Sequence, residues 1–466
     1  MPGRWDMKHV VAVDFGSTFT KVVAADLTAG KLILSDKVPS TVGTDASIGL
    51  EKCFALAKEA LGERAFEDAT KLATSSAAGG LRMSVVGLTD SLSTLAGKGA
   101  ALGAGAKIIG NYSGVLTDEK IKKLEESHTE IVLFCGGYEH GNTDIVLKNA
   151  EKLAASGITV PVIYCGNSDI CQDVRYMMMT GRKQCYVVEN IIPKLKTLNV
   201  EPTQEIIRNL FLTRITDMKG LSAVKQCFDN DLMPTPAAVL TAGTLLNKGT
   251  DRHKGFGPVL IADVGGATTD VYSFNENRAV DGARKIGLEE PFSKRTVEGD
   301  LGMRETSGEV LKQGRAHEIA AELGISEEQL AASVENRVSH IDFLPDTELE
   351  SSIDDAIASL AVATAVRRHA GKVEESFSRK TGMIQTGKNL TDITRIIGTG
   401  GILVYNDDPA KILRSAQKTA ADRKALIPES LETWLDSEYV LFAAGLISEI
   451  DEDAAMELML NSIRKC

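Results

Sequence analysis

Cysteine is sparse in this sequence, and its positions are scattered. Seven cysteines occur in 466 residues, with no CxxC pair and no metal-like cluster with histidine. An odd, dispersed set of this kind is typical of reduced thiols rather than of a disulfide framework. We therefore expect a cytoplasmic protein.

An excess of positive charge is also missing. The chain has 52 lysines and arginines against 64 aspartates and glutamates, which gives a formal net charge of -12. Nucleic acids and anionic lipid surfaces select positive protein surfaces. We therefore expect proteins and small molecules as partners, with no nucleic acid and no membrane, and a homo-oligomer remains compatible with this composition.

Long apolar runs and low-complexity segments are absent as well. No stretch of about 18 apolar residues occurs, and the first nine residues, Met-Pro-Gly-Arg-Trp-Asp-Met-Lys-His, contain no apolar segment typical of a signal sequence. Hydrophobic residues make up 43% and charged residues 25%, as in ordinary globular proteins. At about 150 residues per domain, the length suggests three units or two larger lobes.

The first clear motif lies near the start of the chain. His9-Val-Val-Ala-Val-Asp-Phe-Gly-Ser-Thr-Phe-Thr-Lys-Val-Val-Ala-Ala contains two apolar runs joined by a short polar turn. This pattern predicts a β-hairpin, and Leu32-Ile-Leu predicts a third strand. Apolar residues at helical spacing then predict a helix over 49–61.

The same scheme returns in the second half of the chain. Pro258-Val-Leu-Ile-Ala-Asp-Val-Gly-Gly-Ala-Thr-Thr-Asp-Val-Tyr-Ser-Phe again places an aspartate before a glycine turn between two apolar strands. The distance of about 250 residues is too long for a solenoid repeat and fits two duplicated lobes. We regard this repetition as the most informative feature of the sequence.

Other elements complete the expected organisation. Strands at Ile131-Val-Leu-Phe and 160–164 flank a helical stretch over 143–155, which predicts a βαβ unit. Thr235-Pro opens a helix, Ser326-Glu-Glu-Gln is a helix N-terminus, and a longer helix is expected over 351–377. A helix over 442–463 should pack back across the body, and the acidic run 346–355 should be a solvated helix start.

Each glycine turn can hold phosphate, because backbone N–H groups approach oxygen atoms closely where no side chain intervenes. The candidate binding residues are Gly16, Ser17, Thr18 and Thr20 in the first loop and Gly265, Gly266, Ala267, Thr268 and Asp270 in the second. Asp14 and Asp263 are the candidate ligands of Mg²⁺, held through its waters, and the candidates for orienting an attacking water. Lys21 is a candidate for offsetting charge on the transferred phosphoryl group. The sequence leaves open which carboxylate performs which role.

The two motifs resemble the first and second phosphate motifs of the superfamily that joins acetate kinases, sugar kinases, DnaK-type chaperones and actin. Gly398-Thr-Gly-Gly resembles its adenosine motif, which adds Gly398, Gly400 and Gly401 to the candidate residues. The resemblance implies an α/β fold of two RNase H-like, actin-like ATPase lobes with ATP and Mg²⁺ in a central cleft. It also implies that nucleotide turnover opens and closes the lobes.

On this basis we expect a first lobe over 1–247 and a second over 248–440, with a helical insertion at about 305–390 and a C-terminal helix over 441–466. The second phosphate motif followed by Thr296-Val-Glu-Gly-Asp-Leu-Gly-Met-Arg resembles the MutL proteins that accompany adenosylcobalamin-dependent glutamate mutase, along nearly the whole chain. This resemblance implies an ATP-dependent chaperone or reactivating factor whose client is such a mutase or an aminomutase.

One residue departs from the superfamily pattern. DnaK-type members have a glutamate before Pro-Thr in the first connecting helix, where this chain has Met233. We therefore expect hydrolysis to be slow or to use another group, with Asp231 as the nearest carboxylate. The segment 296–304 contacts nucleotide or client on one interpretation and is a charged surface loop on the other.

Other functions share these motifs. A small-molecule kinase of the same fold is the main alternative, followed by an actin-like filament and by an activator with an iron–sulfur cluster. Such an activator needs cysteines to hold the cluster, and the spacing of Cys135 and Cys165 does not assign them that role. Cys135-Gly-Gly-Tyr-Glu-His-Gly-Asn follows a strand and faces a cleft or a partner, or is a structural turn. It lacks Asp-x-His-x-x-Gly, so we expect the client, not this chain, to carry cobalamin.

Overall fold

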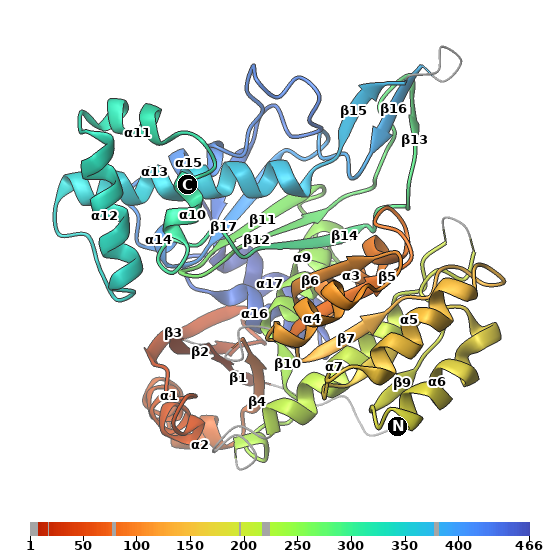
Figure 1. Ribbon diagram of the computed structural model, residues 1–466. Helices are drawn as coiled ribbons and strands as arrows, with labels where there is room; N and C mark the ends of the chain where they lie inside the picture. Colours follow the sequence, from red (N-terminus) through yellow and green to blue (C-terminus); the bar gives the residue numbers. More distant parts are fainter. Residues whose placement is uncertain (1–7, 17, 77–80, 195–196, 217–223, 377–381) are drawn as a thin grey trace. The chain divides into compact units, whose positions relative to one another are not determined.

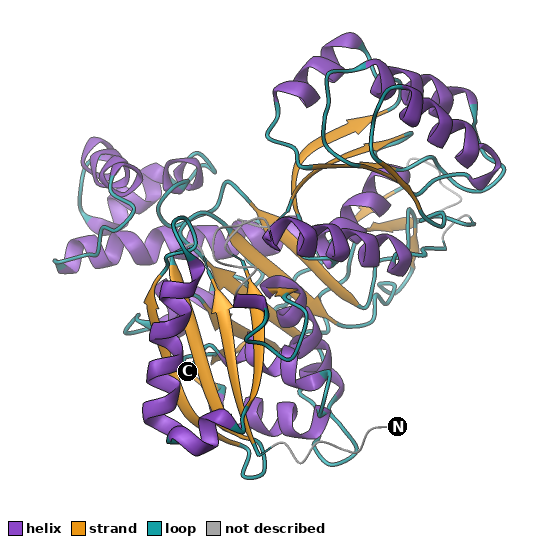
Figure 2. Ribbon diagram, turned by 90° about the horizontal axis from the view of Figure 1, so that it is seen from below, coloured by secondary structure: helices purple, strands orange, loops and turns teal. Residues whose placement is uncertain are grey.

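The computed structural model describes residues 8–16, 18–76, 81–194, 197–216, 224–376 and 382–466 (Figure 1). It forms two compact units, Met1–Val239 with Gly287–Glu289 and Leu240–Ile286 with Glu290–Cys466. The division falls inside α9 (Thr235–Lys248), the helix that was expected to close the first lobe. Figure 2 shows that helices cover the sheets of both units.

The first unit begins with a mixed sheet in the order β10-β4-β1-β2-β3. Strands β1, β2 and β3 form an antiparallel meander, and β4 and β10 run parallel to β1. This is the strand order of an RNase H-like fold, and it confirms the predicted hairpin and third strand. The strands are β1 (His9–Phe15), β2 (Phe19–Asp26), β3 (Lys31–Pro39), β4 (Thr70–Ser75) and β10 (Met233–Pro234).

Helix α1 (Ala46–Leu61) packs on this sheet and is followed by the short α2 (Glu63–Glu67). Asp45 caps α1 by accepting a hydrogen bond from the Ser47 N–H, and Gly62 ends it at a φ of 81°. Its apolar face, with Leu50, Cys53 and Ala57, is buried against strands β1 and β2. The helix predicted over 49–61 is therefore confirmed, with one more turn at its start.

A second, fully parallel sheet lies within the first unit, in the order β6-β5-β7-β8-β9. The predicted βαβ unit is confirmed as β7-α5-β8, but the complete sheet was not recognised from the sequence. Its order, 2-1-3-4-5 along the chain, is that of a doubly wound flavodoxin-like sheet. Alternate residues enter two separate cores, Val85 and Leu133 on one face and Val86 and Phe134 on the other, as a sheet covered on both sides requires.

The elements of this part are the strands β5 (Arg82–Gly87), β6 (Lys107–Ser113), β7 (Ile131–Phe134), β8 (Val162–Tyr164) and β9 (Cys185–Val187), and the helices α3 (Ser93–Gly103), α4 (Asp118–Glu126), α5 (Asp144–Ala155), η1 (Ser168–Ile170), α6 (Cys171–Thr180) and α7 (Glu201–Thr216).

The second unit repeats the topology of the first sheet. Its order is β14-β12-β11-β17-β18-β19, with β12 antiparallel to its neighbours β11 and β14, and with β17 and β18 parallel to β11. The predicted class of two RNase H-like lobes is thus confirmed by strand order and direction. The strands are β11 (Val259–Val264), β12 (Thr269–Phe274), β14 (Ser293–Glu298), β17 (Arg395–Thr399), β18 (Glu432–Leu435) and β19 (Arg464–Lys465).

Helices follow β14, as expected. Figure 1 shows α10 (Ser307–Leu311), α11 (Ala316–Leu323) and α12 (Glu327–Ser339) grouped at one end of the long α13 (Glu348–His369). The predicted start at Ser326 is confirmed, because Ser326 and Gln329 form a reciprocal capping box.

Two expectations for this region were wrong. Helix α13 ends at His369 rather than Phe377, because Ala370 is already extended and the strand β15 begins at Lys372. The stretch expected to be helical to residue 390 also contains the strands β15 (Lys372–Glu375) and β16 (Met383–Thr386), which form a small sheet with the earlier β13 (Ala283–Lys285). The acidic run at the start of α13 is not uniformly solvated, since Asp354 is buried.

The C-terminal segment also differs from its prediction. The single helix expected over 442–463 is two helices, α16 (Val440–Ser448) and α17 (Glu452–Ser462), because Asp451 caps a new helix by accepting from the Ala454 N–H. Two short helices, α14 (Gly401–Val404) and α15 (Pro409–Arg414), precede them. Among the described residues, no helix has the length and apolar character needed to cross a bilayer.

Candidate functional site

The first glycine turn joins β1 to β2. The Gly16 N–H donates to the Phe19 carbonyl oxygen at 3.1 Å, which closes the hairpin. A Cβ on Gly16 would lie 2.5 Å from that oxygen, so only glycine fits. Asp14 stands two residues before the turn, and Lys21 is its register partner on β2. The hairpin therefore brings a carboxylate and an ammonium group to one end of the sheet.

Asp14 is held by two hydroxyl groups from neighbouring strands and helices. Its Oδ1 accepts from Thr74 Oγ1 on β4 at 3.1 Å and from Thr235 Oγ1, the first residue of α9, at 2.5 Å. Burial raises the pKa of this carboxyl, against the opposing effects of Lys21 and the two hydroxyls. A buried carboxylate with a raised pKa and fixed orientation is typical of a general base.

The second glycine turn has the same geometry. The Gly265 N–H donates to the Thr268 carbonyl oxygen at 2.9 Å, two residues after Asp263, just as Gly16 follows Asp14. Asp270 is the register partner of Asp263, in the place that Lys21 has beside Asp14. The two hairpins are thus equivalent in turn length, closing hydrogen bond and carboxylate position.

Asp270 has a structural partner. Its Oδ1 accepts from Arg295 Nε at 2.8 Å and from Arg295 Nη2 at 2.6 Å, and both side chains are largely buried. Burial opposes the charge on the guanidinium, but the contact with Asp270 outweighs it and the pKa of Arg295 is raised. We therefore assign Asp270 to the support of the second loop, with its charge neutralised by Arg295.

The second loop is also clamped by the segment 301–306. The N–H groups of Met303 and Arg304 donate to the carbonyl oxygens of Gly265 and Gly266 at 3.0 and 2.8 Å, and Thr306 Oγ1 donates to the Ala267 oxygen at 3.2 Å. A charged surface loop would not make these backbone contacts. This segment therefore holds the loop in shape through the carbonyl oxygens of Gly265, Gly266 and Ala267.

The third glycine motif lies beside the second loop. Thr399 pairs with Asp263 across β17 and β11, and Gly400 follows at a φ of 100°. A Cβ on Gly400 would lie 2.3 Å from the Val264 carbonyl oxygen. Gly398 is enclosed by Leu403 and Leu413, whereas the space around Gly401 is open. Within the second unit, the two motifs therefore lie side by side.

The remaining candidates of the first loop fall into different environments. Ser17 lies outside the described residues, and Thr18 is exposed at the tip of the turn. Thr20 is buried, and its hydroxyl lies 3.2 Å from the position of a Cβ on Gly49 of α1. We therefore expect Thr20 to support the loop from within the core. In the second loop, Gly266 is exposed and Ala267 and Thr268 are half-buried.

Several residues at the site were not identified from the sequence. Thr74, Arg295 and Asp436 carry no motif of their own. Asp436 accepts from the Val440 N–H at 2.8 Å, so it caps α16 and positions Tyr439, which adopts a left-handed φ of 52°. Burial raises the pKa of the Tyr439 hydroxyl, and the nearby charges add to that rise. In the sequence, only the Pro234-Thr235 pair at the start of α9 indicated that Thr235 belongs to the site.

The donor set fits a hydrated magnesium ion. Asp14 and Asp263 are each the penultimate residue of a strand that leads into a glycine turn, and Mg²⁺ in proteins is usually held by one or two carboxylates together with phosphate oxygens and water. The described part of the chain contains no group of three or more His, Cys, Asp or Glu residues that could ligate a metal by themselves. Each unit thus supplies one aspartate of the type that ligates Mg²⁺ in proteins.

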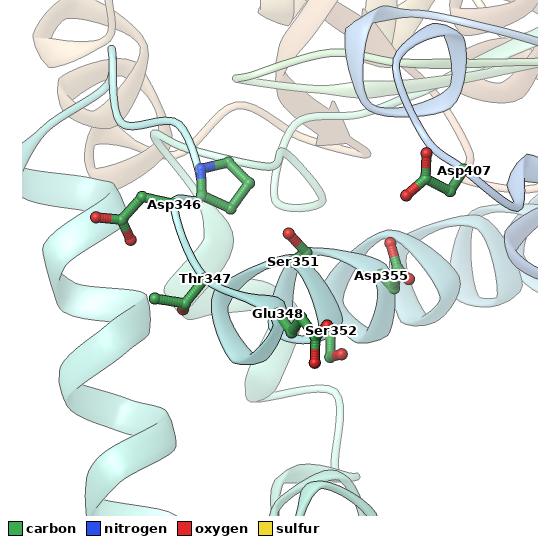
Figure 3. Close-up of a pocket in the computed structure, with 8 residues that line it drawn as sticks. Asp346, Thr347, Glu348, Ser351, Ser352, Asp355 and Asp407 are labelled. Atoms are coloured by element: carbon green, nitrogen blue, oxygen red, sulfur yellow. The ribbon is translucent and has the colours of Figure 1, made fainter.

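A separate pocket of about 520 Å³ lies at the start of α13 (Figure 3). Figure 3 shows the side chains of Glu348 and Asp355 on α13, with Asp346 and Asp407 nearby. Four carboxylates repel phosphate groups, so this pocket does not suit a nucleotide. It is distinct from the glycine turns.

Comparison with known proteins gives two kinds of match. A family model described as MutL protein matches residues 10–463. Protein MutL of Clostridium tetanomorphum is 38% identical over 456 residues, which cover 97% of this chain and 98% of that protein.

Among solved structures, a xylulose kinase from Bifidobacterium adolescentis is 13% identical, with a TM-score of 0.32, over 97% of this chain and 93% of its own. The ethanolamine utilization protein EutJ from Carboxydothermus hydrogenoformans is 8% identical, with a TM-score of 0.24, over 96% and 90%. These scores are too low to support an argument, and the fold class rests on the strand orders above. The family model and the MutL relative, both nearly full-length, show that this chain belongs to the MutL protein family.

Proposed function

We propose that this protein binds ATP with Mg²⁺ through the glycine turns of both units. The repeated hairpin supports this most directly: each turn is closed by the same backbone hydrogen bond and has one aspartate two residues before its first glycine. Backbone N–H groups bind phosphate oxygens without regard to which phosphate they meet. The Gly398–Gly401 turn would accept the adenosine, because it adjoins the second loop.

We propose further that the protein hydrolyses ATP slowly. Asp14 would accept the proton of the attacking water, since its raised pKa brings it closer to a base that works near neutral pH. Lys21, its cross-strand neighbour, would offset charge on the transferred group. When bound, Mg²⁺ would neutralise phosphate charge, with Asp14 and Asp263 holding its water shell.

Met233 supports the expectation of slow turnover. It lies on β10, paired with Thr74, one residue before Pro234 and two before the Thr235 that holds Asp14. A thioether can neither accept a proton nor hold a metal-bound water. Asp231 is exposed and paired with Lys225 at 2.8 Å, so it does not replace the missing glutamate.

The client we propose is an adenosylcobalamin-dependent mutase of the glutamate mutase or aminomutase type. Membership of the MutL family and the resemblance of the second phosphate motif and residues 296–304 support this choice. Nucleotide turnover would change the conformation of the protein and so exchange damaged cobalamin for intact cofactor in the client.

The test is phosphate release from ATP by the purified protein, alone and with a mutase inactivated by turnover. We expect slow basal release, stimulation by the inactivated mutase and recovery of mutase activity. Asp263→Ala should abolish all three, whereas Asp281→Ala, an exposed loop carboxylate in the same unit, should abolish none.

Two outcomes would refute parts of this proposal. An absence of ATP binding by equilibrium dialysis would refute the nucleotide site itself. ATP turnover that responds to one metabolite and yields a phosphorylated product, with no response to any cobalamin mutase, would instead identify a small-molecule kinase.

A further inference from the structure

A second pocket lies in the parallel sheet of the first unit, far along the chain from the glycine turns. It has a volume of about 240 Å³ and is lined by residues that follow β7, β8 and β9. These strands are parallel, so their carboxyl ends share one edge of the sheet. Doubly wound sheets bind their ligands at this edge. The lining residues are Glu139, Gly166, Ser168, Cys171, Val187, Val188, Glu189, Asn190, Pro193 and Asn199.

Asn190 gives the pocket an unsatisfied hydrogen-bond donor. Its side chain is 4% exposed, and its Oδ1 accepts from the Ile192 N–H at 2.9 Å. That bond fixes which end of the carboxamide is oxygen, because a backbone N–H cannot face the NH₂ group. Nδ2 is buried with no acceptor among the described residues. A buried donor without a partner costs about 1–3 kcal/mol, so a ligand acceptor there would be favourable.

Two carboxylates face the same pocket with spare acceptor capacity. Glu139 Oε2 accepts from the Ser168 N–H at 2.7 Å, and Glu189 Oε2 accepts from Asn199 Nδ2 at 2.9 Å. An ionised carboxylate can accept about four hydrogen bonds, so each side chain retains free lone pairs. The pocket therefore combines one free donor with free acceptors, and its negative charge disfavours phosphates and carboxylates.

One wall of the pocket is apolar, and two of its loops are closely packed. Val187, Val188 and Pro193 form the wall after β9. Gly166 lies so close to Gly136 that a Cβ would come within 2.3 Å of its backbone, which keeps the two loops in contact. Such walls suit a flat ring, and the volume suits a ligand smaller than a nucleotide.

We propose that this pocket binds a neutral small molecule in which a flat ring carries a carboxamide. The carboxamide oxygen accepts from Asn190 Nδ2, its NH₂ group donates to Glu139 or Glu189, and the ring packs on Val187 and Val188. The loop that begins at Cys135, left without a role by the nucleotide site, supplies Glu139 to this pocket. Binding here is independent of ATP, so the proposal stands or falls separately from the proposed function.

Nicotinamide is the probe and nicotinate is its matched control. They have the same ring and almost the same shape, but nicotinate has no NH₂ donor and carries a negative charge. Titrations are followed by saturation-transfer NMR with ATP and Mg²⁺ in excess, which occupies any nucleotide site. We expect nicotinamide to bind with a Kd on the order of 1 mM, as suits so small a ligand, and nicotinate to bind at least about tenfold more weakly.

The discriminating variant is Asn190→Asp, which keeps the oxygen that accepts from Ile192 but removes the NH₂ donor. Asn142→Asp is the control, because Asn142 Oδ1 also accepts a backbone N–H, from Ile145 at 2.9 Å, outside the pocket. Asn190→Asp should lose nicotinamide binding and Asn142→Asp should retain it. If Asn190→Asp fails to fold, Ser168→Trp, which fills the pocket from an exposed position, replaces it. Equal binding of the two ligands, no binding of nicotinamide, or retention of binding in the pocket variants would each overturn the proposal.

Discussion

Arg304 and Asp354 form a buried ion pair that ties the second glycine loop to the helices following it. Arg304 donates two hydrogen bonds to Asp354, at 3.2 and 3.0 Å, while its own N–H donates to the Gly266 oxygen. Asp354 also accepts from Arg337 Nε at 2.7 Å, and Arg337 is fully buried on α12. One carboxylate on α13 therefore compensates two guanidinium groups.

Removing that carboxylate should be strongly destabilising. Asp354→Ala leaves Arg304 without its carboxylate and Arg337 with Glu350 as its remaining carboxylate partner, and breaking a buried network of this kind costs about 3–5 kcal/mol. Asp355→Ala is the control. Asp355 is the half-buried neighbour of Asp354 in the sequence, and among the described contacts its side chain accepts a hydrogen bond only from Asn406. Urea denaturation measures both. Equal loss of unfolding free energy in the two variants would contradict the assigned role of Asp354.

The glycines of the third motif should respond differently to the same substitution. Gly400→Ala puts a Cβ at a φ of 100° and 2.3 Å from the Val264 oxygen, so the β11 end must move. We expect a loss of about 1–3 kcal/mol in stability and weaker ATP binding. Gly401→Ala meets no atom within 4 Å and should change neither. Thermal unfolding and ATP titration of the two variants compare them directly.

The fold was predictable where the signal was local. Asp14–Gly16 and Asp263–Gly265 repeat within short segments, so the turns and the duplication could be inferred from the sequence alone. The β7-α5-β8 unit was also recognisable, but the sheet around it was not, because β8 and β9 are three residues each and periodicity is too weak at that length.

The supporting residues of the site were less predictable, because they arrive from distant parts of the chain. Arg295 and Asp354 are ordinary charged residues in the sequence and acquire their roles only when β14 lies beside β12 and α13 beside α12. The prediction of a single helix over 442–463 was wrong for a different reason. Its apolar spacing continues across Glu449–Asp451, and only the capping bond of Asp451 divides it.

His369 should make the protein sensitive to acid. Its ring lies buried between Ser273 Oγ, at 2.7 Å from Nε2, and Thr296 Oγ1, at 2.8 Å from Nδ1. Burial lowers the pKa of this imidazole well below its usual 6.5, and Lys294 and Lys388 lower it further. Below pH 6.5 the unfolded chain therefore binds a proton that the folded protein excludes, and stability falls by up to about 1.4 kcal/mol per pH unit.

The measurement for His369 is the unfolding free energy between about pH 7 and pH 5, the range set by the usual imidazole pKa. His369→Gln should show a shallower dependence on pH than the unmodified protein. His317→Gln alters an exposed side chain, 85% accessible, and should keep the original slope. If the slope in His369→Gln is unchanged, the acid sensitivity lies elsewhere.

Asp14 should control the pH dependence of ATP hydrolysis. Because burial raises its pKa above 3.8, activity should rise with pH as the carboxyl ionises, with an acid limb above that value. Thr235→Val removes the 2.5 Å hydrogen bond that favours the ionised form, so the limb should move to higher pH. Thr244→Val makes the same change on α9 away from Asp14 and should leave the limb in place.

A stability measurement separates this catalytic role from a structural one. A carboxyl group whose pKa is raised in the folded protein destabilises the fold as the pH rises through that pKa. The reason is that ionisation then places a negative charge in a buried position. Asp14→Asn should therefore abolish ATP turnover while keeping or increasing the unfolding free energy at neutral pH. Asp36→Asn, an exposed carboxylate on β3, should change neither. Loss of both stability and activity in Asp14→Asn would show that the carboxylate is needed for the fold. If the acid limb of the pH–activity profile does not shift in Thr235→Val, Asp14 is excluded as the base.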